Sequence, residues 1–274
     1  AALSSGAGRL GRDFDVSGLE DISDAEYDAL KPTRWPITAT RTGGRFFGDG
    51  AFFNPDGRAR FLAVRQKAPA AKRTPRYPYR LNTGRTRDQW HTMTRTGLAP
   101  RLSRHLAEPF LQIHPDDAAM LNLAPADLAR VSSQHGSAIL RTLVSDDARP
   151  GAPFAPMHWT GETAPAARID ALVAPAVDPI SGQPESKARV VAIERFDAGW
   201  YGFAVAADKP AANVAYWARV RTEQGWRMEL AGETPCGDWA GFARRLFGLD
   251  TEPQVLTDAA FGTTRLAFAD EAGT

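Results

Sequence analysis

Short apolar runs separated by turn residues dominate the middle of the chain. Four segments have the length and apolar content of short strands: 109–114, 128–133, 137–145 and 190–196. Residues 115–123 begin with Pro115 and two aspartates, which favour the N-terminus of one short helix. Many short strands around one small helix predict a closed β-barrel, within a chain that is mainly β with some α structure.

Residues 1–31 are rich in glycine, serine and aspartate. Within "SGLEDISDAEYDAL" the sequence predicts one short helix with Ser23 or Asp24 as its N-cap. The turn signal "NPDG" at 54–57 separates two aromatic-rich runs and predicts a β-hairpin. Residues 67–75 combine proline, alanine and basic residues, which is typical of a linker.

The last part of the chain carries a second set of patterns. "YWARVRT" and "GWRMELAG" flank a turn-forming "EQG" and predict a β-hairpin. "CGDWAGFARRLFG" places Trp239, Phe242 and Leu246 on one helical face, and "TTRLAFAD" predicts a late strand. We therefore expect three regions: an N-terminal extension (1–76) left from a preceding domain, a barrel (77–196) and a small α+β unit (197–274) of unknown role.

Composition narrows the function classes. The 274 residues carry a net charge of +1, so no overall field draws the chain to nucleic acid or to a membrane. The single cysteine, Cys236, excludes an internal disulfide framework and a cysteine-ligated metal cluster within this chain. No apolar run has the length of a membrane helix, and the N-terminus lacks a signal-peptide core. These features favour a protein of the cytoplasm.

Residues 81–97, "LNTGRTRDQWHTMTRTG", have the most unusual chemistry in the sequence. They hold three arginines, five threonines and almost no aliphatic residue, so the segment is not expected in the core. The wider segment 72–105 has nine basic residues and one acid, a local charge of +8. Arginine, threonine and glycine suit phosphate groups, and Trp90 with His91 offers flat surfaces for a heterocycle. The alternative is a solvated basic loop.

Several common catalytic and nucleotide-binding motifs are missing. The segment matches neither the phosphate loop GxxxxGK[ST] nor GxGxxG, which argues against a nucleoside triphosphatase or a Rossmann domain. The five histidines lack HExxH or HxxxH spacing, and no GxSxG accompanies a nucleophile. We expect these histidines to cap or pack, and we expect neither catalytic residues nor metal ligands in this chain.

Four motifs in order resemble one family. Residues 81–97 are followed by "PFLQIHPDDAAMLNL", "PFAPMHW" and "DPISGQPESK". This series resembles the molybdopterin-guanine-dinucleotide-binding domain of the molybdopterin oxidoreductases. Within that family the pattern is most similar to the assimilatory nitrate reductases. "GAFFNPDGRARF" also resembles the stretch that precedes this domain, and the resemblance is best over residues 35–196.

The resemblance implies a fold and a set of binding residues. It implies a six-stranded double-psi β-barrel over 77–196, with the turn at Thr83 and the run at Trp90 lining one pterin dinucleotide. His158, Trp159 and Lys187 would approach from later loops. We expect the cofactor-binding residues to be Thr83, Gly84, Arg85, Asp88, Trp90, His91, Thr92, Thr94, His158, Trp159, Asp170 and Lys187.

Two of these expectations have a separate basis. Asp88 is our own inference, because a carboxylate can accept from the N–H groups of a guanine edge. Asp170 stands where the family commonly has asparagine. An ionised aspartate only accepts hydrogen bonds, so it must meet N–H donors if it faces a pterin.

The family also implies what surrounds the domain. Its enzymes hold molybdenum on two molybdopterin guanine dinucleotides and carry an iron–sulfur cluster on an N-terminal cysteine motif, which this chain lacks. We therefore expect a C-terminal fragment, inactive alone, of an enzyme that reduces nitrate to nitrite in nitrate assimilation. Its partners would be the remaining domains and an electron donor. The alternatives are a formate dehydrogenase of the same family and a stand-alone nucleic-acid-binding module, which the local charge of +8 would suit.

Overall fold

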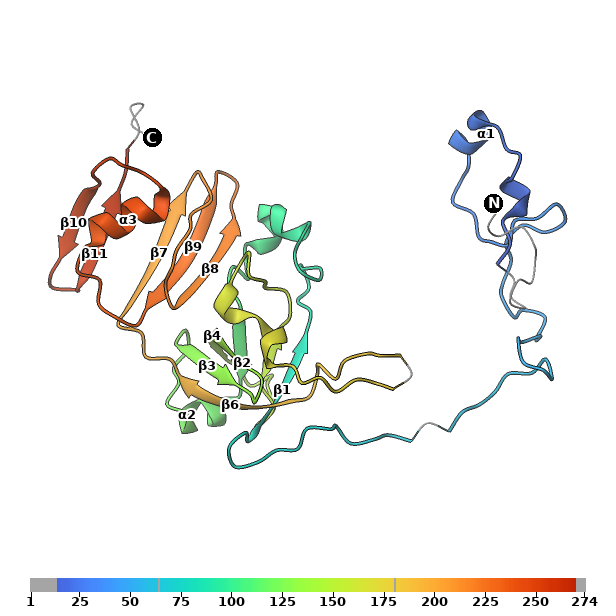
Figure 1. The fold of residues 1–274 in the computed structure, drawn as a ribbon, viewed down its shortest axis with the longest axis horizontal. Helices are drawn as coiled ribbons and strands as arrows, with labels where there is room; N and C mark the ends of the chain where they lie inside the picture. The colour runs from blue at the N-terminus through green and yellow to red at the C-terminus, as the bar shows by residue number, and fades with distance from the viewer. Residues whose placement is uncertain (1–13, 64, 180, 270–274) are drawn as a thin grey trace. The chain divides into compact units, whose positions relative to one another are not determined.

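The computed structural model describes residues 14–63, 65–179 and 181–269. The chain divides into two compact units between Lys67 and Ala68, and each unit is treated separately below. Figure 1 shows the elements of both units in sequence colours.

The first unit contains little regular structure. A 3₁₀ turn, η1 (Ser17–Leu19), is followed by helix α1 (Asp24–Asp28). Ser23 is the N-cap of α1: its hydroxyl accepts from the Glu26 N–H, and the Glu26 carboxylate accepts from the Ser23 N–H, which completes a capping box. The predicted helix is confirmed, and Ser23 is its N-cap.

The predicted hairpin around 54–57 is wrong. The turn itself forms, since Gly57 N–H donates to the Asn54 carbonyl at 2.9 Å. No strand flanks it among the described residues of this unit. The aromatic side chains that suggested strands pack on one another instead, and Phe47 stacks on Phe52 with ring centroids 4.8 Å apart. In this segment the aromatic residues form a side-chain cluster and not paired strands.

The second unit is built on a closed six-stranded barrel. The strands are β1 (Tyr79–Gly84), β2 (Phe110–Ile113), β3 (Leu128–Ser132), β4 (Ser137–Val144), β5 (Phe154–Pro156) and β6 (Arg189–Arg195). They close in the order β1-β5-β2-β4-β3-β6 (Figure 1). The pairs β1–β5 and β2–β4 are parallel and the other pairs antiparallel, so the chain crosses over between strands. This barrel confirms the predicted fold class.

Short helical segments connect the barrel strands. Helix α2 (Pro115–Met120) begins at His114, whose Nδ1 accepts from the Asp116 N–H at 3.1 Å, so this histidine caps as expected. Four 3₁₀ turns complete the connections: η2 (Thr96–Leu98), η3 (Pro100–Ser103), η4 (Pro165–Ala167) and η5 (Ile169–Leu172).

Alternate residues of the strands fill the barrel. Fully buried examples from different strands are Leu81, Leu111, Leu128, Leu140 and Val191. The expectation that 81–97 lies outside the core is wrong in part. Leu81 is completely buried on β1, and Met93 is only 6% exposed because its side chain joins the same apolar cluster. A polar segment is thus fixed to the barrel by two apolar residues.

The remaining strands form two small sheets. The first has the order β7-β9-β8, from β7 (Trp200–Ala206), β8 (Tyr216–Arg221) and β9 (Trp226–Gly232). Helix α3 (Trp239–Phe247) precedes the hairpin of β10 (Gln254–Asp258) and β11 (Thr263–Ala267). The predicted β8–β9 hairpin, the helix and the late strand are confirmed, whereas β7 and β10 are additional.

Each face of the three-stranded sheet packs against a different layer. Tyr216 and Ala218 of β8 join the barrel core. On the other face, Met228 of β9 packs with Leu246 of α3, and Trp200 meets the Phe242 ring edge-on at 5.4 Å. The sheet therefore links the barrel to α3 within one unit. None of the helices in the described parts of the chain is long and apolar enough to cross a membrane.

Candidate functional site

The candidate site is built at the end of strand β1. This strand delivers Thr83 and Gly84, and the chain then continues into residues 85–95, which we call the site loop. Gly84 is closely packed: a Cβ at this position would lie 3.0 Å from the Phe154 ring of neighbouring β5. Strand pairing thus fixes where the site loop begins, beside residues 153–159.

The site loop itself contains a tight and unusual turn. His91 and Met93 have left-handed φ angles of 42° and 59°, which side chains other than glycine rarely adopt. The Met93 N–H donates to the Trp90 carbonyl at 2.9 Å, and the buried Met93 side chain holds the turn against the barrel. Strain of this kind collects at sites where the surrounding structure demands a particular loop shape.

His158 bonds to two points of the site loop, Thr86 at its start and His91 within the turn. It is fully buried, and its Nε2 accepts from the Thr86 N–H at 2.9 Å. Its Nδ1 lies 2.6 Å from the His91 carbonyl oxygen. Burial lowers the pKa of His158, the hydrogen bond to His91 opposes this, and the nearby Arg85 lowers the pKa further.

Lys187 reaches the same strand end from the loop before β6. Its Nζ donates to the Thr83 carbonyl at 3.0 Å, and the Thr83 hydroxyl donates to the Ser186 carbonyl at 3.1 Å. Two predicted residues that lie 104 positions apart are therefore in direct contact. The amine places one positive charge next to β1, where an anionic group would be attracted.

Exposed side chains of the site loop offer a flat face and hydroxyl groups. The Arg85 guanidinium lies 5.0 Å from the Trp90 ring centroid, and Trp90 meets the His91 ring edge-on at 4.5 Å. Trp90 nevertheless remains 58% exposed. The hydroxyls of Thr92 and Thr94 lie 2.8 Å apart on the exposed side of the loop. A heterocycle can reach the Trp90 ring without any rearrangement of the barrel.

Asp88 is occupied by other groups of the chain. Its two carboxylate oxygens accept from Arg87 Nε and Nη2 at 2.9 and 3.0 Å, and His105 Nε2 lies 2.6 Å from Oδ2. The hydrogen bonds from Arg87 lower the pKa of Asp88. A guanine edge would have to compete with this pairing.

Asp170 lies apart from these residues. It belongs to η5, which contacts β4, and its side chain is exposed. No hydrogen bond, ion pair or ring contact among the described residues joins Asp170 to the cluster at β1. The other predicted residues lie at the end of β1, in the site loop, at 158–159 or at Lys187. His158 and Lys187 contact the β1 end or the site loop directly, whereas Asp170 does not.

Much of the local positive charge is already used by the chain. Arg73 donates to the Gly151 carbonyl, and Arg80 donates to the carbonyls of Ala188 and Ala71. Arg104 pairs with Glu223. Part of the charge of +8 counted over residues 72–105 is therefore taken up by structural contacts. Arg85 of that segment lies in the site loop, and Lys187, from outside the segment, adds a further positive charge at the end of β1.

Three residues that were not predicted to belong to the site carry buried polar atoms. Thr86 Oγ1 and Gln89 Oε1 are buried without a hydrogen-bond partner among the described residues, although both lie inside the stretch that drew attention. Arg189, opposite Leu81 on β6, is 2% exposed, and its Nε and Nη2 likewise have no partner there. In the sequence, the available signal was that Arg189 directly precedes the apolar run of the predicted strand 190–196.

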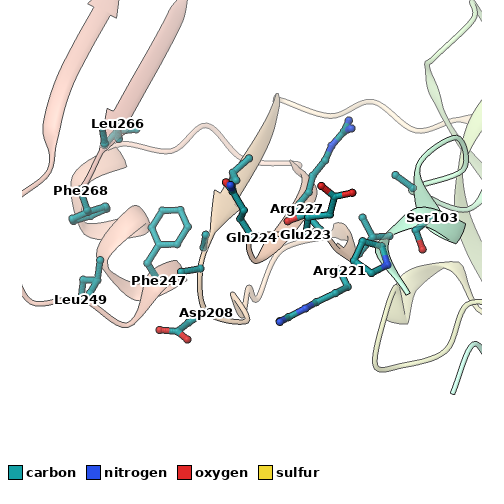
Figure 2. Close-up of a pocket in the computed structure, with 18 of the residues that line it drawn as sticks. Ser103, Asp208, Arg221, Glu223, Gln224, Arg227, Phe247, Leu249, Leu266 and Phe268 are labelled. Carbon is teal, nitrogen blue, oxygen red and sulfur yellow. The ribbon is translucent and has the colours of Figure 1, made fainter. Parts of the chain in front are cut away.

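A large cavity of about 1340 Å³ lies elsewhere, and none of the predicted site residues is among the described residues that line it. Figure 2 shows Phe247, Leu249 and Phe268 on one side of this cavity, facing charged residues such as Glu223 of the β8–β9 turn and Arg227 of β9. The cavity is lined by residues of η3 and of the C-terminal sheets, and among the described residues it shares no lining residue with the predicted site at β1.

Comparison with known proteins assigns this arrangement to a family. The family model of the molydopterin dinucleotide binding domain matches residues 79–190, which include strands β1–β5, the start of β6, the site loop, His158 and Lys187. Residues 79–190 are a molydopterin dinucleotide-binding domain. The resemblance inferred from the four sequence motifs is confirmed.

Curated relatives of the dinucleotide-binding domain and its flanks are much longer proteins. A nitrate reductase of Klebsiella oxytoca is 38% identical over 240 residues, which cover 87% of this chain and 27% of that protein. A nitrate reductase of Shewanella frigidimarina is 31% identical over 84% of this chain and 27% of the relative. The F420-dependent formate dehydrogenase subunit alpha of Methanocaldococcus jannaschii is 30% identical, over 59% of this chain and 23% of the relative.

The chain thus spans about a quarter of the length of these relatives. The two nitrate reductases match it beyond the dinucleotide-binding domain, so similarity to nitrate reductases extends over most of the chain.

The residues of the dinucleotide-binding domain fit a pterin dinucleotide. Besides Thr86 Oγ1, the indole Nε1 of Trp159 is buried with no partner among the described residues, and each can donate to a ligand oxygen. Lys187 and Arg85 add positive charge for phosphates, and Trp90 adds an exposed ring. Among the described residues no group of three His, Cys, Asp or Glu side chains could hold a metal ion.

Proposed function

We propose that the dinucleotide-binding domain holds one molybdopterin guanine dinucleotide at the end of β1. The observation that carries this proposal is the meeting of Lys187, the Thr83 carbonyl and the site loop at a place where buried donors lack partners. Lys187 and Arg85 would attract the phosphates, Trp90 would stack on a ring, and Thr86 and Trp159 would donate to ligand oxygens.

We further propose that this domain works as part of a longer nitrate reductase of nitrate assimilation in the cytoplasm. Support comes from two relatives that match 87% and 84% of this chain and are nitrate reductases several times its length. When bound, the molybdenum cofactor supplies two-electron redox chemistry. The residues of this chain bind and orient the dinucleotide, and the chain alone is inactive because the other domains and an electron donor are required.

A second candidate is formate oxidation by a longer enzyme of the same family. One relative is a formate dehydrogenase subunit that is 30% identical over 59% of this chain. The dinucleotide contacts proposed above would serve either substrate, because none of them distinguishes nitrate from formate.

The longer protein provides the test. It should be purified from a host that makes the molybdenum cofactor, analysed for molybdenum and guanine nucleotide, and assayed with nitrate plus a reduced viologen dye and with formate plus an oxidised one. We expect bound molybdenum and nitrate reduction. Formate oxidation without nitrate reduction would favour the second candidate. Protein that contains no molybdenum and no pterin would contradict both.

A further inference from the structure

The hydrogen bonds of His158 fix the protonation state of its ring. A backbone N–H can only donate, so the Thr86 N–H at 2.9 Å requires a lone pair on Nε2. A carbonyl oxygen can only accept, so the His91 oxygen at 2.6 Å from Nδ1 requires a proton on Nδ1. His158 is therefore the neutral tautomer with its proton on Nδ1. Both ring nitrogens are used inside the chain, which leaves neither for a ligand.

These two bonds connect one buried side chain to the start of the site loop and to the strained turn within it. Thr86 lies just after β1, and His91 carries one of the two left-handed φ angles. No other described side chain makes hydrogen bonds to both places. The unpartnered Thr86 hydroxyl belongs to the residue whose N–H is bound by His158, so the imidazole fixes where that hydroxyl lies.

We propose that His158 is a positioning residue: as the neutral Nδ1–H tautomer it holds the site loop in the shape that receives the dinucleotide, and its protonation releases that loop. This proposal rests on the proposed function, since it assigns the loop's role to dinucleotide binding. His158 acts through Thr86 and His91 rather than by touching the ligand.

Protonation would place an N–H group on Nε2 directly opposite the Thr86 N–H, so one of the two bonds would be lost. The groups whose charges act on His158 are Arg85 and His91, both in the site loop. Neither can offer a negative charge to balance an imidazolium ion. The same burial and the same Arg85 that lower the pKa of His158 therefore favour the neutral ring that the loop requires.

The loop shape can be tested without any cofactor. In the full 274-residue chain, long-range proton–nitrogen NMR spectra of the histidine rings report which nitrogen of His158 is protonated, and hydrogen exchange reports the protection of the Thr86 amide. The informative variants are His158→Gln, whose side-chain oxygen can still accept near the Nε2 position, and His158→Asn, which is too short to reach Thr86. His135→Gln, an exposed histidine in the β3–β4 turn, is the matched control.

We expect an Nδ1–H tautomer at pH 7.5 and exchange of the Thr86 amide at least about tenfold faster in His158→Asn, because a lost hydrogen bond of about 1.4 kcal/mol changes opening by that factor. His158→Gln should remain close to the parent, as should His135→Gln. Lowering the pH to 5 should increase Thr86 exchange relative to the Val131 amide of β3 in the parent and not in His158→Gln.

Three results would overturn the proposal. These are an Nε2–H or doubly protonated ring at pH 7.5, unchanged Thr86 exchange in His158→Asn, and equal losses in both His158 variants. A parallel titration with guanosine diphosphate separates this idea from the proposed function. Weaker binding in His158→Asn than in His158→Gln supports positioning for the ligand. Equal binding in the two variants would contradict a role of His158 in positioning the loop for the ligand. If the parent chain does not bind guanosine diphosphate, that result counts against the proposed function itself.

Discussion

Two buried polar networks in the second unit differ in how completely the chain satisfies them. Where the barrel meets the three-stranded sheet, Arg141 Nε and Nη2 donate to the two oxygens of Glu108 at 3.0 and 3.1 Å, and the Tyr216 hydroxyl donates to Glu108 at 2.7 Å. At the site loop, by contrast, Thr86 Oγ1 and Trp159 Nε1 are buried without partners among the described residues.

This difference indicates that the Glu108 network stabilises the fold, whereas the buried donors near the site loop are available to a ligand. Burial and the adjacent Glu108 raise the pKa of Tyr216 well above its ordinary value, so its hydroxyl stays protonated and donates to Glu108. That network is closed and joins two parts of the chain. Buried donors without partners are rare in folded proteins, and those at the site loop are consistent with a ligand that comes from outside. Predictions that act on one network and not on the other test this contrast.

The largest expected effect belongs to the closed network. Glu108→Ala should lower the free energy of unfolding by about 3 kcal/mol, because the Arg141 guanidinium stays mostly buried without its carboxylate. Urea denaturation of the 274-residue chain measures this. Glu194→Ala is the control, since its pairing with Arg130 at 3.7 Å is largely exposed and should contribute less than about 1 kcal/mol. Equal losses in the two variants would refute the contrast.

Lys187→Met should affect binding and leave stability nearly unchanged. We expect affinity for guanosine diphosphate to fall about tenfold, since a charge-assisted contact contributes about 1.4 kcal/mol or more. Calorimetric titration measures this, with Lys209→Met as the control, because that lysine pairs with the exposed Glu162 away from β1. If both lysine variants bind as the parent does, Lys187 is no phosphate contact.

Trp90→Leu should have a smaller effect on the same titration. Loss of one stacking ring costs about 1 kcal/mol, or about fivefold in affinity. The unfolding free energy should stay the same, because Trp90 is largely exposed. Phe203→Leu, an exposed aromatic residue on β7, is the matched control and should bind normally. A stability loss in Trp90→Leu without a binding loss would reverse the assignment.

The smallest expected effect is a pH dependence from His158. Its folded-state pKa lies below the ordinary value of 6.5. The neutral ring therefore contributes stability that is complete above about pH 6.5 and is lost as the pH falls through the folded-state pKa. Denaturation curves of the parent between pH 7.5 and 5 should show this loss and those of His158→Gln should not, whereas identical pH profiles would rule it out.

The sequence predicted the barrel from its more apolar strands and missed strands whose apolar patterns are weak. Strands β2, β3, β4 and β6 have clear apolar content, whereas β5 has three residues and ends in Pro156. In β1 only Tyr79 and Leu81 are apolar, and Leu81 is followed by Asn82 and Thr83. Such strands form because neighbouring strands complete their hydrogen bonds, and that pairing over long sequence separations has no local signature.

The candidate site was partly accessible for the same reason. Residues of the site loop were found together because they are contiguous and chemically unusual. The bonds from His158 to Thr86 and His91 span 72 and 67 residues, so the sequence suggested that His158 contacts the cofactor but not that both ring nitrogens are used internally. The pairing of Asp88 with Arg87 and His105 and the separate position of Asp170 also depend on the folded chain.

Hydrogen exchange of the 274-residue chain with and without guanosine diphosphate tests the central claim most directly. The account predicts saturable binding with new protection in the site loop and around residues 158–159 and 187, and little change in β7–β11. Absence of binding, or protection confined to the cavity between η3 and the C-terminal sheets, would contradict a dinucleotide site at the end of β1.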